Sequence, residues 1–119
     1  MDKDIFCKII NGEVAGNKIV MEEDSWIAMN DIHPSAPVHV LIIPKRHIDG
    51  ILATETSDVE LMGTLLLAVK KVAEKMGLKE NGFRLVINQG EYGGQVVQHL
   101  HIHLLGGKKL GVKIVHDQN

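Results

Sequence analysis

Near its C-terminal end the chain alternates strictly between histidine and aliphatic residues. Residues 99–105 read His-Leu-His-Ile-His-Leu-Leu, and such a period of two is typical of a β-strand. On a strand, His99, His101 and His103 project from one face and the aliphatic residues from the other. We therefore expect a strand over residues 98–105 that presents three imidazole rings on one face, with their Cα atoms about 6.5–7 Å apart.

Shorter apolar runs predict the elements that come before this strand. Two of them flank a polar turn at residues 23–25, which is typical of a hairpin. Another is rich in β-branched residues and stops at Pro44, as expected for a strand. The predicted elements are a short helix at 5–10 and strands at 19–22, 26–30, 38–43 and 83–88.

One long amphipathic helix is predicted between residues 57 and 77. Ser57 and Glu60 match the capping-box pattern of a helix start, and Gly77 suits the position just past a helix end. The apolar residues cover an arc of about 160°, wider than a single core-facing stripe, and Leu67 lies outside even that arc. Such a helix is either deeply buried in one chain or shared between the core and a partner subunit. The order of helices and strands predicts an α+β fold, an antiparallel sheet with helical cover.

Composition narrows the class of protein. At 119 residues the chain predicts one domain over 1–119, with residues 108–119 as a C-terminal tail. The formal net charge of −2 gives no general attraction for nucleic acid. No apolar stretch is long enough to span a membrane, and the charged start of the chain lacks the apolar segment of a signal peptide. A single cysteine, Cys7, fits a reducing compartment. We expect a cytoplasmic protein that binds neither nucleic acid nor a membrane.

The histidine strand has three interpretations that differ in chemistry. The histidines are surface residues without a joint role, or they bind a metal such as zinc, or they act as nucleophile, acid and base. The surrounding sequence favours no metal and no cofactor. Gly107 and Lys108 stand where a carboxylate ligand would follow the histidines, and Asp4 stands where a second cysteine would pair with Cys7.

A glycine-rich segment just before the strand favours the catalytic interpretation. Gly93 and Gly94 are followed by Gln95, and main-chain N–H groups in such a segment form nests that bind anions. A phosphate held there would lie beside the histidines. The sequence therefore predicts chemistry at a phosphate group.

Four segments of the chain resemble a known family. Residues 88–107 read Asn-Gln-Gly-Glu-Tyr-Gly-Gly-Gln-Val-Val-Gln-His-Leu-His-Ile-His-Leu-Leu-Gly-Gly. This run resembles the signature of the histidine triad (HIT) superfamily, His-φ-His-φ-His-φ-φ with φ hydrophobic. Residues 4–10, 30–37 and 39–47 are similar to its Hint branch, the purine nucleoside phosphoramidases. The resemblance implies a HIT-like fold with a five-stranded antiparallel sheet, one long and one short helix, and a homodimer formed through the long helix and an edge strand.

The resemblance also implies a role for each matching residue. His101 is expected to attack an α-phosphate, and His103 to contact phosphate oxygens. The main-chain carbonyl of His99 is expected to hold the Nδ1 proton of His101, and His39 to assist proton relay. The expected substrate site comprises Asp31 at the ribose, Asn88, Gly94, Gln95 and Val96 at the phosphate, and Ile5, Phe6, Ile9, Met29, Asn30 and Ile32 at the purine. On residue type alone, the apolar members of this set are more typical of a core.

Three further histidines have no catalytic role in this comparison. His47 is either structural or in contact with the triad from behind. His33 and His116 are expected at the surface.

Two positions depart from the pattern of many Hint proteins. Val96 replaces a serine, so that a hydroxyl near the leaving group is missing while the N–H remains, and Met29 replaces an aromatic residue beneath the purine. The implied function is hydrolysis of the P–N bond of purine nucleoside 5′-phosphoramidates, such as an AMP–amine, through a covalent nucleotidyl-histidine. The alternatives are a dinucleoside polyphosphate hydrolase of the same superfamily, or a nucleotide-binding or scaffold protein with little turnover.

Overall fold

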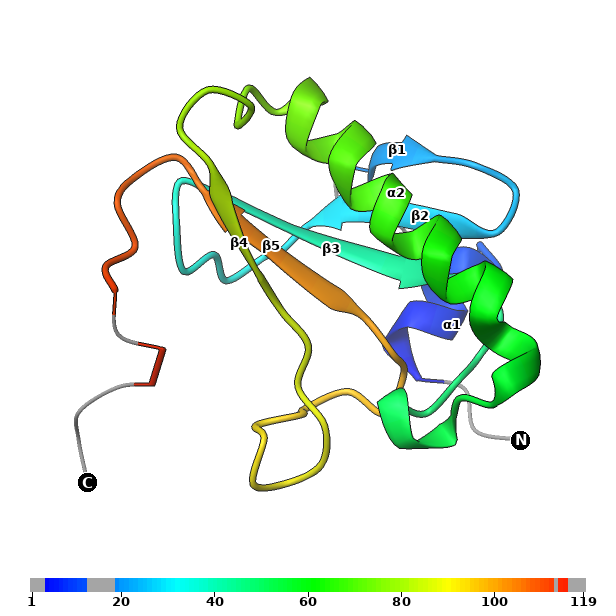
Figure 1. The fold of residues 1–119 in the computed structure, drawn as a ribbon. Coiled ribbons are helices and arrows are strands. Elements are labelled where there is room, and N and C mark those ends of the chain that lie inside the picture. The colour runs from blue at the N-terminus through cyan, green and yellow to red at the C-terminus, as the bar shows by residue number, and fades with distance from the viewer. Residues whose placement is uncertain (1–3, 13–18, 113, 116–119) are drawn as a thin grey trace.

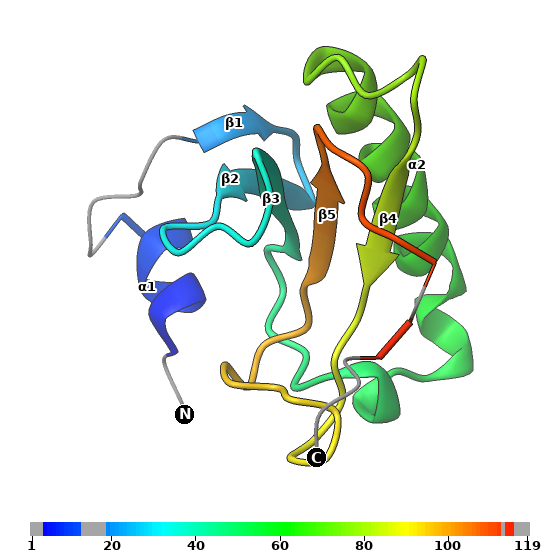
Figure 2. The same cartoon turned by 90° about the vertical axis from the view of Figure 1, so that its left-hand side faces the viewer.

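The computed structural model describes residues 4–12, 19–112 and 114–115, which form an α+β fold (Figure 1). Five antiparallel strands make one sheet in the order β1-β2-β3-β5-β4. The short helix α1 lies on one side of the sheet and the long helix α2 on the other (Figure 2). The elements are α1 (Ile5–Ile10), β1 (Ile19–Glu22), β2 (Trp26–Asn30), β3 (Val38–Pro44), the 3₁₀ turns η1 (Ile51–Ala53) and η2 (Thr56–Asp58), α2 (Val59–Lys75), β4 (Phe83–Val86) and β5 (Ile102–Gly106). The predicted fold class, sheet and pair of helices are confirmed.

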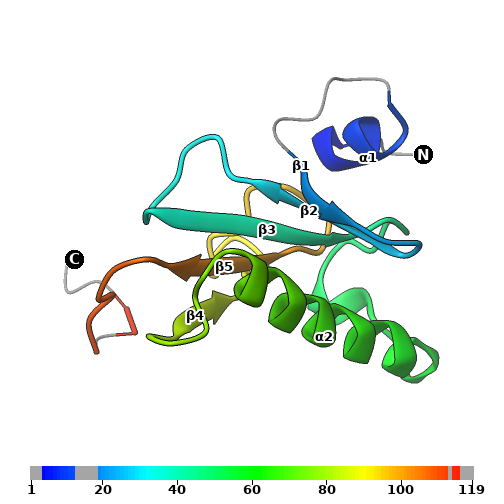
Figure 3. The same ribbon diagram turned by 90° about the horizontal axis from the view of Figure 1, so that it is seen from above.

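The sheet is apolar on both sides, which is why its central strands form continuous apolar runs in the sequence. In β2, Trp26 and Ala28 pack in the core beneath α2, while Ile27 and Met29 pack with Phe6 of α1. We call these two sides the α2 face and the α1 face. Figure 3 shows the two helices on either side of the sheet. The α2 face also holds Val40, Ile42, Leu100, Ile102 and Leu104, and the α1 face also holds Leu41 and Ile43.

Helix α2 covers its face of the sheet with one apolar side and leaves other apolar residues outside. Leu65, Val69 and Val72 are buried in the core. Leu66 and Leu67 are 55% and 64% exposed. Gly77 follows the helix with a φ of +77°, as predicted for the residue after a helix end. No helix in the described ranges combines the length and apolarity needed to cross a membrane.

The start of α2 differs from the prediction. Ser57 lies inside the 3₁₀ turn η2, so it does not cap the helix through Glu60. The capping box is formed instead by Glu55 and Asp58, and the N–H of Glu55 donates to Asp58 Oδ2 at 2.9 Å. Arg46 contacts the other carboxylate oxygen of Asp58. This capping box belongs to η2, and the N-cap of α2 itself makes no side-chain hydrogen bond to the helix.

Strand β5 begins at Ile102 and not at residue 98, so of the three histidines only His103 lies within it. The N–H of Lys45 donates to the carbonyl of Ser25 on the β2 side. By alternation, the backbone groups of Pro44 therefore point toward β5. Because proline has no N–H, the ladder ends there, and the N–H of Leu100 donates to the carbonyl of Ile48 at 2.6 Å.

Strand β4 is also shorter than predicted. It ends at Val86, which pairs with His103 near the start of β5. In this register residue 87 lies opposite Ile102, the first residue of β5, yet the strand does not include residues 87 and 88. The division between the two faces still extends past the strand end, since Leu100 packs in the same core as Ile102.

Candidate active site

A cavity of about 490 Å³ lies on the α1 face of the sheet. This volume is within the usual range for a small-ligand pocket. The lining residues are Ile5, Phe6, Ile9, Met29, Asn30, Asp31, Ile32, His33, Leu41, Asn88, Gly94, Val96, Val97, His101 and His103. All predicted substrate-site residues except Gln95 are therefore brought together.

His101 presents one ring nitrogen as an acceptor. Its Nδ1 lies 2.6 Å from the main-chain carbonyl of His99. A carbonyl only accepts, so we assign the proton of the neutral ring to Nδ1. Nε2 of His101 then carries a lone pair, which is the state that a nucleophile requires. The edge of the His101 ring packs against Phe6, with ring centroids 5.1 Å apart.

His103 has the opposite proton arrangement. The N–H of Ser35 donates to Nδ1 of His39 at 2.9 Å, which places the proton of a neutral His39 on Nε2. That Nε2–H donates to Nδ1 of His103, also at 2.9 Å. The proton of His103 therefore lies on Nε2. His101 and His103, with ring centroids 5.0 Å apart, thus place a lone pair and an N–H donor side by side.

Burial keeps these three rings neutral. Loss of hydration lowers the pKa of His101, outweighing the hydrogen bond to the carbonyl of His99. Burial and the adjacent His101 and His39 rings lower the pKa of His103 to about 4. Burial also lowers the pKa of His39, against the attraction of the Asp31 carboxylate. At neutral pH all three histidines are uncharged, as the tautomer assignment requires.

The glycine loop has the shape that its sequence demands, but not the expected anion nest. A Cβ on Gly93 would lie 2.4 Å from the carbonyl oxygen of Gln89, and Gly94 has a φ of +81°. The N–H of Gly94 donates to the carbonyl of Glu91, and the N–H of Gln95 to that of Gly90, each at 3.0 Å. These two amides hold the loop together, so they do not form the predicted nest.

Gln95 is a structural residue of the same loop. Its side-chain Nε2 donates to the carbonyls of Asp49 and Val97 at 2.7 and 3.1 Å, and its Oε1 accepts the N–H of Gly90 at 2.9 Å. The side chain is buried, which explains why Gln95 does not line the cavity. Asn88 lines it and also donates to the carbonyl of Gly93 at 2.6 Å.

The mouth of the cavity combines a carboxylate with exposed apolar side chains. Asp31 Oδ1 accepts the N–H of His33 at 2.8 Å, and its Oδ2 lies 3.4 Å from Nε2 of His39. Ile32 is 62% exposed and Val96 is 89% exposed. Apolar side chains in this position bury surface when a ligand enters.

Three lining residues were not predicted. His33 was expected at the surface; it is exposed and stands at the rim. Val97 directly follows the lining residue Val96. Leu41 lies two residues after His39 on β3 and so faces the same side of the sheet, which could have indicated its position. His116 lies outside the described residues.

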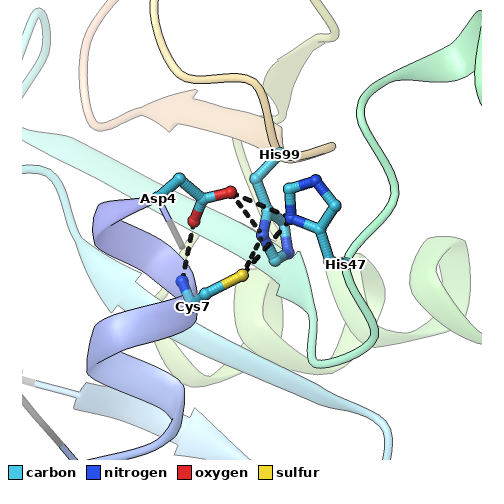
Figure 4. Close-up of side chains that lie close together, drawn as sticks. All are labelled: Asp4, Cys7, His47 and His99. Carbon is cyan, nitrogen blue, oxygen red and sulfur yellow. Dashed lines mark hydrogen bonds and ion pairs between the residues drawn. The ribbon is translucent and has the colours of Figure 1, made fainter. Parts of the chain in front are cut away.

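His99 turns its side chain away from the cavity. The ring is fully buried, its Nε2 donates to the carbonyl of Pro44 at 2.8 Å, and its other nitrogen faces Asp4 and Cys7 of α1 (Figure 4). His47 contacts it edge to face from behind, with ring centroids 4.9 Å apart. His99 therefore acts on His101 through its main-chain carbonyl.

Sequence and structure comparisons agree with this geometry. The HIT domain family matches residues 12–110. An uncharacterized HIT-like protein of Synechococcus elongatus is 51% identical over 106 residues, which cover 89% of this chain and 91% of that protein. The purine nucleoside phosphoramidase of Escherichia coli K12 is 39% identical over 115 residues, or 97% of this chain and 96% of the enzyme.

A solved structure shows the same fold at high similarity. The HIT family hydrolase from Clostridium thermocellum aligns with a TM-score of 0.92 and 45% identity, over 97% of this chain and 99% of that one. With the triad, its neutral imidazoles and the match over most of its length, the chain belongs to the histidine triad (HIT) family.

Proposed function

We propose that this protein is a hydrolase that cleaves the P–N bond of purine nucleoside 5′-phosphoramidates. The observation that carries the proposal is the pair of neutral imidazoles with opposite tautomers at one wall of the cavity. Nε2 of His101 offers a lone pair to a phosphorus atom, and Nε2–H of His103 offers a hydrogen bond to one of its oxygens. The named activity of the E. coli relative supports the same choice of bond.

The reaction proceeds in two displacements. His101 Nε2 forms a bond to the α-phosphorus as the P–N bond breaks, and the departing amine takes up one proton. Water then attacks the same phosphorus, the bond to His101 breaks, and the water gives up one proton. A covalent route of this kind replaces one difficult displacement with two easier ones. The carbonyl of His99 holds the His101 ring in place throughout.

The rest of the cavity fits a nucleoside. Its floor is apolar, with Phe6, Met29 and Leu41 buried beneath the site, and flat bases bind favourably against such surfaces. Asp31 supplies an acceptor for ribose hydroxyls at the mouth. We assign the main-chain N–H of Val96, a residue that lines the cavity, to a phosphate oxygen.

A single-turnover experiment tests this proposal. Adenosine 5′-phosphoramidate is mixed with excess protein and quenched, and AMP release and the mass of the peptide that contains His101 are measured. We expect AMP and a transient adenylyl group on His101. Diadenosine tetraphosphate is the comparison substrate: faster cleavage of it would replace the proposal with the polyphosphate hydrolase, and turnover of neither would favour a binding protein.

We also propose that the chain is a homodimer. Leu66 and Leu67 of α2 are exposed, and β4 is an edge strand whose Phe83 and Leu85 are 44% and 38% exposed. Exposed apolar side chains on a long helix and on an edge strand are what an interface between two copies of the chain would bury. Sedimentation at micromolar concentration should give twice the chain mass, and Leu67→Lys should shift it toward the monomer. A monomeric wild-type chain would contradict this.

A further inference from the structure

A carboxylate and two imidazole rings form a chain of contacts on the α1 face. Nε2 of His39 lies 2.9 Å from Nδ1 of His103 and 3.4 Å from Oδ2 of Asp31. The side chains of His39 and Asp31 are 5% and 19% exposed. The Nε2–H of His39 therefore lies close to two acceptors, a neutral ring nitrogen and a carboxylate oxygen.

Residues 31–37, the segment between β2 and β3, fix the ring of His39. The N–H of Asp31 donates to the main-chain carbonyl of His39, and the N–H of Ser35 donates to Nδ1 of its ring, each at 2.9 Å. Turning Nδ1 toward His103 would break the bond from Ser35. The ring therefore offers its Nε2–H to His103, and the position of this one proton determines how His103 is held.

The carboxylate of Asp31 competes with His103 for the Nε2–H of His39. At 3.4 Å the contact is longer than a normal hydrogen bond, but the negative charge attracts the N–H across that distance. The same charge acts on both rings: burial lowers the pKa of His39 and of His103, and the Asp31 carboxylate opposes the shift in each case.

Asp31 also lines the mouth of the cavity, where the proposed function puts the ribose. Its Oδ1 accepts the N–H of His33 at 2.8 Å, and each ribose hydroxyl is a further donor to the carboxylate. Additional donors spread the negative charge and weaken its attraction for the Nε2–H of His39. Hydrogen bonds in a chain polarise one another, so a stronger bond to Nδ1 of His103 makes its Nε2–H a better donor.

We propose that Asp31 is a positioning residue that couples ribose binding to His103. Ribose hydroxyls bound to its carboxylate direct the Nε2–H of His39 onto His103, and His103 then binds the phosphate oxygen more strongly. This inference rests on the proposed function for the place of the substrate. It means that the site selects ribonucleotides in the chemical step as well as in binding, whereas a carboxylate that merely held the ribose would change KM alone.

Nuclear magnetic resonance of the histidine ring nitrogens tests the coupling without a reaction. The wild-type chain is titrated with adenosine and with 2′,3′-dideoxyadenosine, and His39→Gln and His103→Gln assign the signals. Neither nucleoside carries a phosphate, so a difference between them arises from the ribose hydroxyls. We expect adenosine to move the Nδ1 resonance of His103 upfield, because the hydrogen bond to it strengthens, and dideoxyadenosine to move it much less.

Asp31→Asn removes the charge at nearly constant size and should abolish this difference between the nucleosides. Asp24→Asn is the matched control, because it removes one acidic charge from the exposed turn between β1 and β2. It should keep the difference seen in the wild type. Far-UV circular dichroism checks that each variant is folded.

Single-turnover cleavage provides the kinetic arm of the test. The rate constant at saturating substrate is measured for adenosine 5′-phosphoramidate and for its 2′,3′-dideoxy analogue. Loss of the hydroxyls should lower the rate constant roughly two- to tenfold, the range of one neutral hydrogen bond. In His39→Gln both substrates should react slowly and at equal rates, while the hydroxyls still lower the half-saturating concentration.

Three results would overturn the coupling. These are equal shifts of the His103 resonance with the two nucleosides, binding of neither nucleoside at millimolar concentration, or a loss of hydroxyls that raises the half-saturating concentration and leaves the rate constant unchanged. If the chain cleaves neither phosphoramidate, the proposed function fails, and the comparison of the two nucleosides still decides whether Asp31 couples the ribose to His103.

Discussion

The two faces of the sheet are built from the same strands but differ in what they hold. On the α2 face, Ala28, Ile42 and Leu104 are fully buried and apolar, and the helix closes over them. On the α1 face, the neighbouring position in β5 is His103, the short helix covers only part of the surface, and a cavity remains. Adjacent residues of one strand thus have different tasks: one stabilises the fold and the next faces the cavity.

This division lets strongly buried histidines exist beside a well-packed core. The ring of His101 donates to the carbonyl of His99, and the ring of His103 accepts from the ring of His39. The alternating apolar residues of the same segment supply the burial energy that holds the strand. Changes on the α1 face should therefore alter activity, and changes on the α2 face should alter stability.

The largest expected effect is a loss of turnover caused by a substitution on the α1 face. His101→Ala removes the proposed nucleophile, and turnover of adenosine phosphoramidate should fall roughly 10³-fold or more. Its midpoint of urea unfolding should change little. His33→Ala, which removes an exposed histidine at the cavity rim, is the control and should retain most activity. Full activity in His101→Ala would remove this residue from the nucleophile role.

The matching change on the α2 face is Leu104→Ala. This side chain is fully buried in the core, and its truncation should lower the free energy of unfolding by about 2–5 kcal/mol. The kcat/KM of the folded protein should be preserved. Leu52→Ala, at a side chain that is 82% exposed, should change stability by less than about 0.5 kcal/mol. Equal effects of the two variants would show that the faces are not distinct.

Lower pH should reduce the folding stability of the protein through the buried histidines of the α1 face. Unfolded histidines have a pKa near 6.5, whereas His103 has a pKa of about 4 in the fold. Between these values the unfolded chain binds more protons, so stability decreases as pH falls from about 6.5 toward 4. Each such histidine contributes up to about 1.4 kcal/mol per pH unit. Urea unfolding at several pH values should show this slope, and His103→Gln should reduce it. An unchanged slope would contradict the pKa of His103.

The smallest expected effect concerns the rim of the cavity. Val96 has no hydroxyl to donate to the leaving group or to a phosphate oxygen, and a neutral hydrogen bond contributes about 0.5–1.5 kcal/mol. Val96→Ser should therefore raise kcat/KM roughly two- to tenfold. Val96→Ala separates the loss of size from the gain of a hydroxyl. If neither variant is faster than the wild type, the site does not need this hydroxyl.

Hydrophobic periodicity predicted most of the fold because successive strand residues face opposite sides of the sheet. This alternation can be read from a short stretch of sequence. The alternation around His101 assigned each side chain to its correct side of the sheet, and the runs at β2 and β3 gave their bounds to within a residue. The predicted strand at 83–88 ends at Val86 in the structure. The predicted start of β5 was wrong because Pro44, more than 50 positions before Leu100, decides where the ladder between β3 and β5 stops. That register is set by the tertiary fold and is absent from any short window of sequence.

The substrate site shows the same limit. The resemblance placed Phe6, Asp31 and His103 together, and they line one cavity. Gln95 does not line this cavity, because hydrogen bonds to distant carbonyls, such as that of Asp49, determine where its side chain lies. The meeting of Asp4 with His47 could not be predicted from spacing, since the contact joins residues from different elements.

Pro44 has a consequence for the design of enzymes on antiparallel sheets. A residue without an N–H leaves its neighbour strand unpaired at that point, and its own carbonyl becomes an acceptor for the ring of His99. A regular ladder would hold the backbone of residues 99–101 straight and would engage that carbonyl. A designer who needs reactive side chains at a strand end can place one proline opposite them. The result is a short irregular stretch, and side-chain hydrogen bonds set its direction.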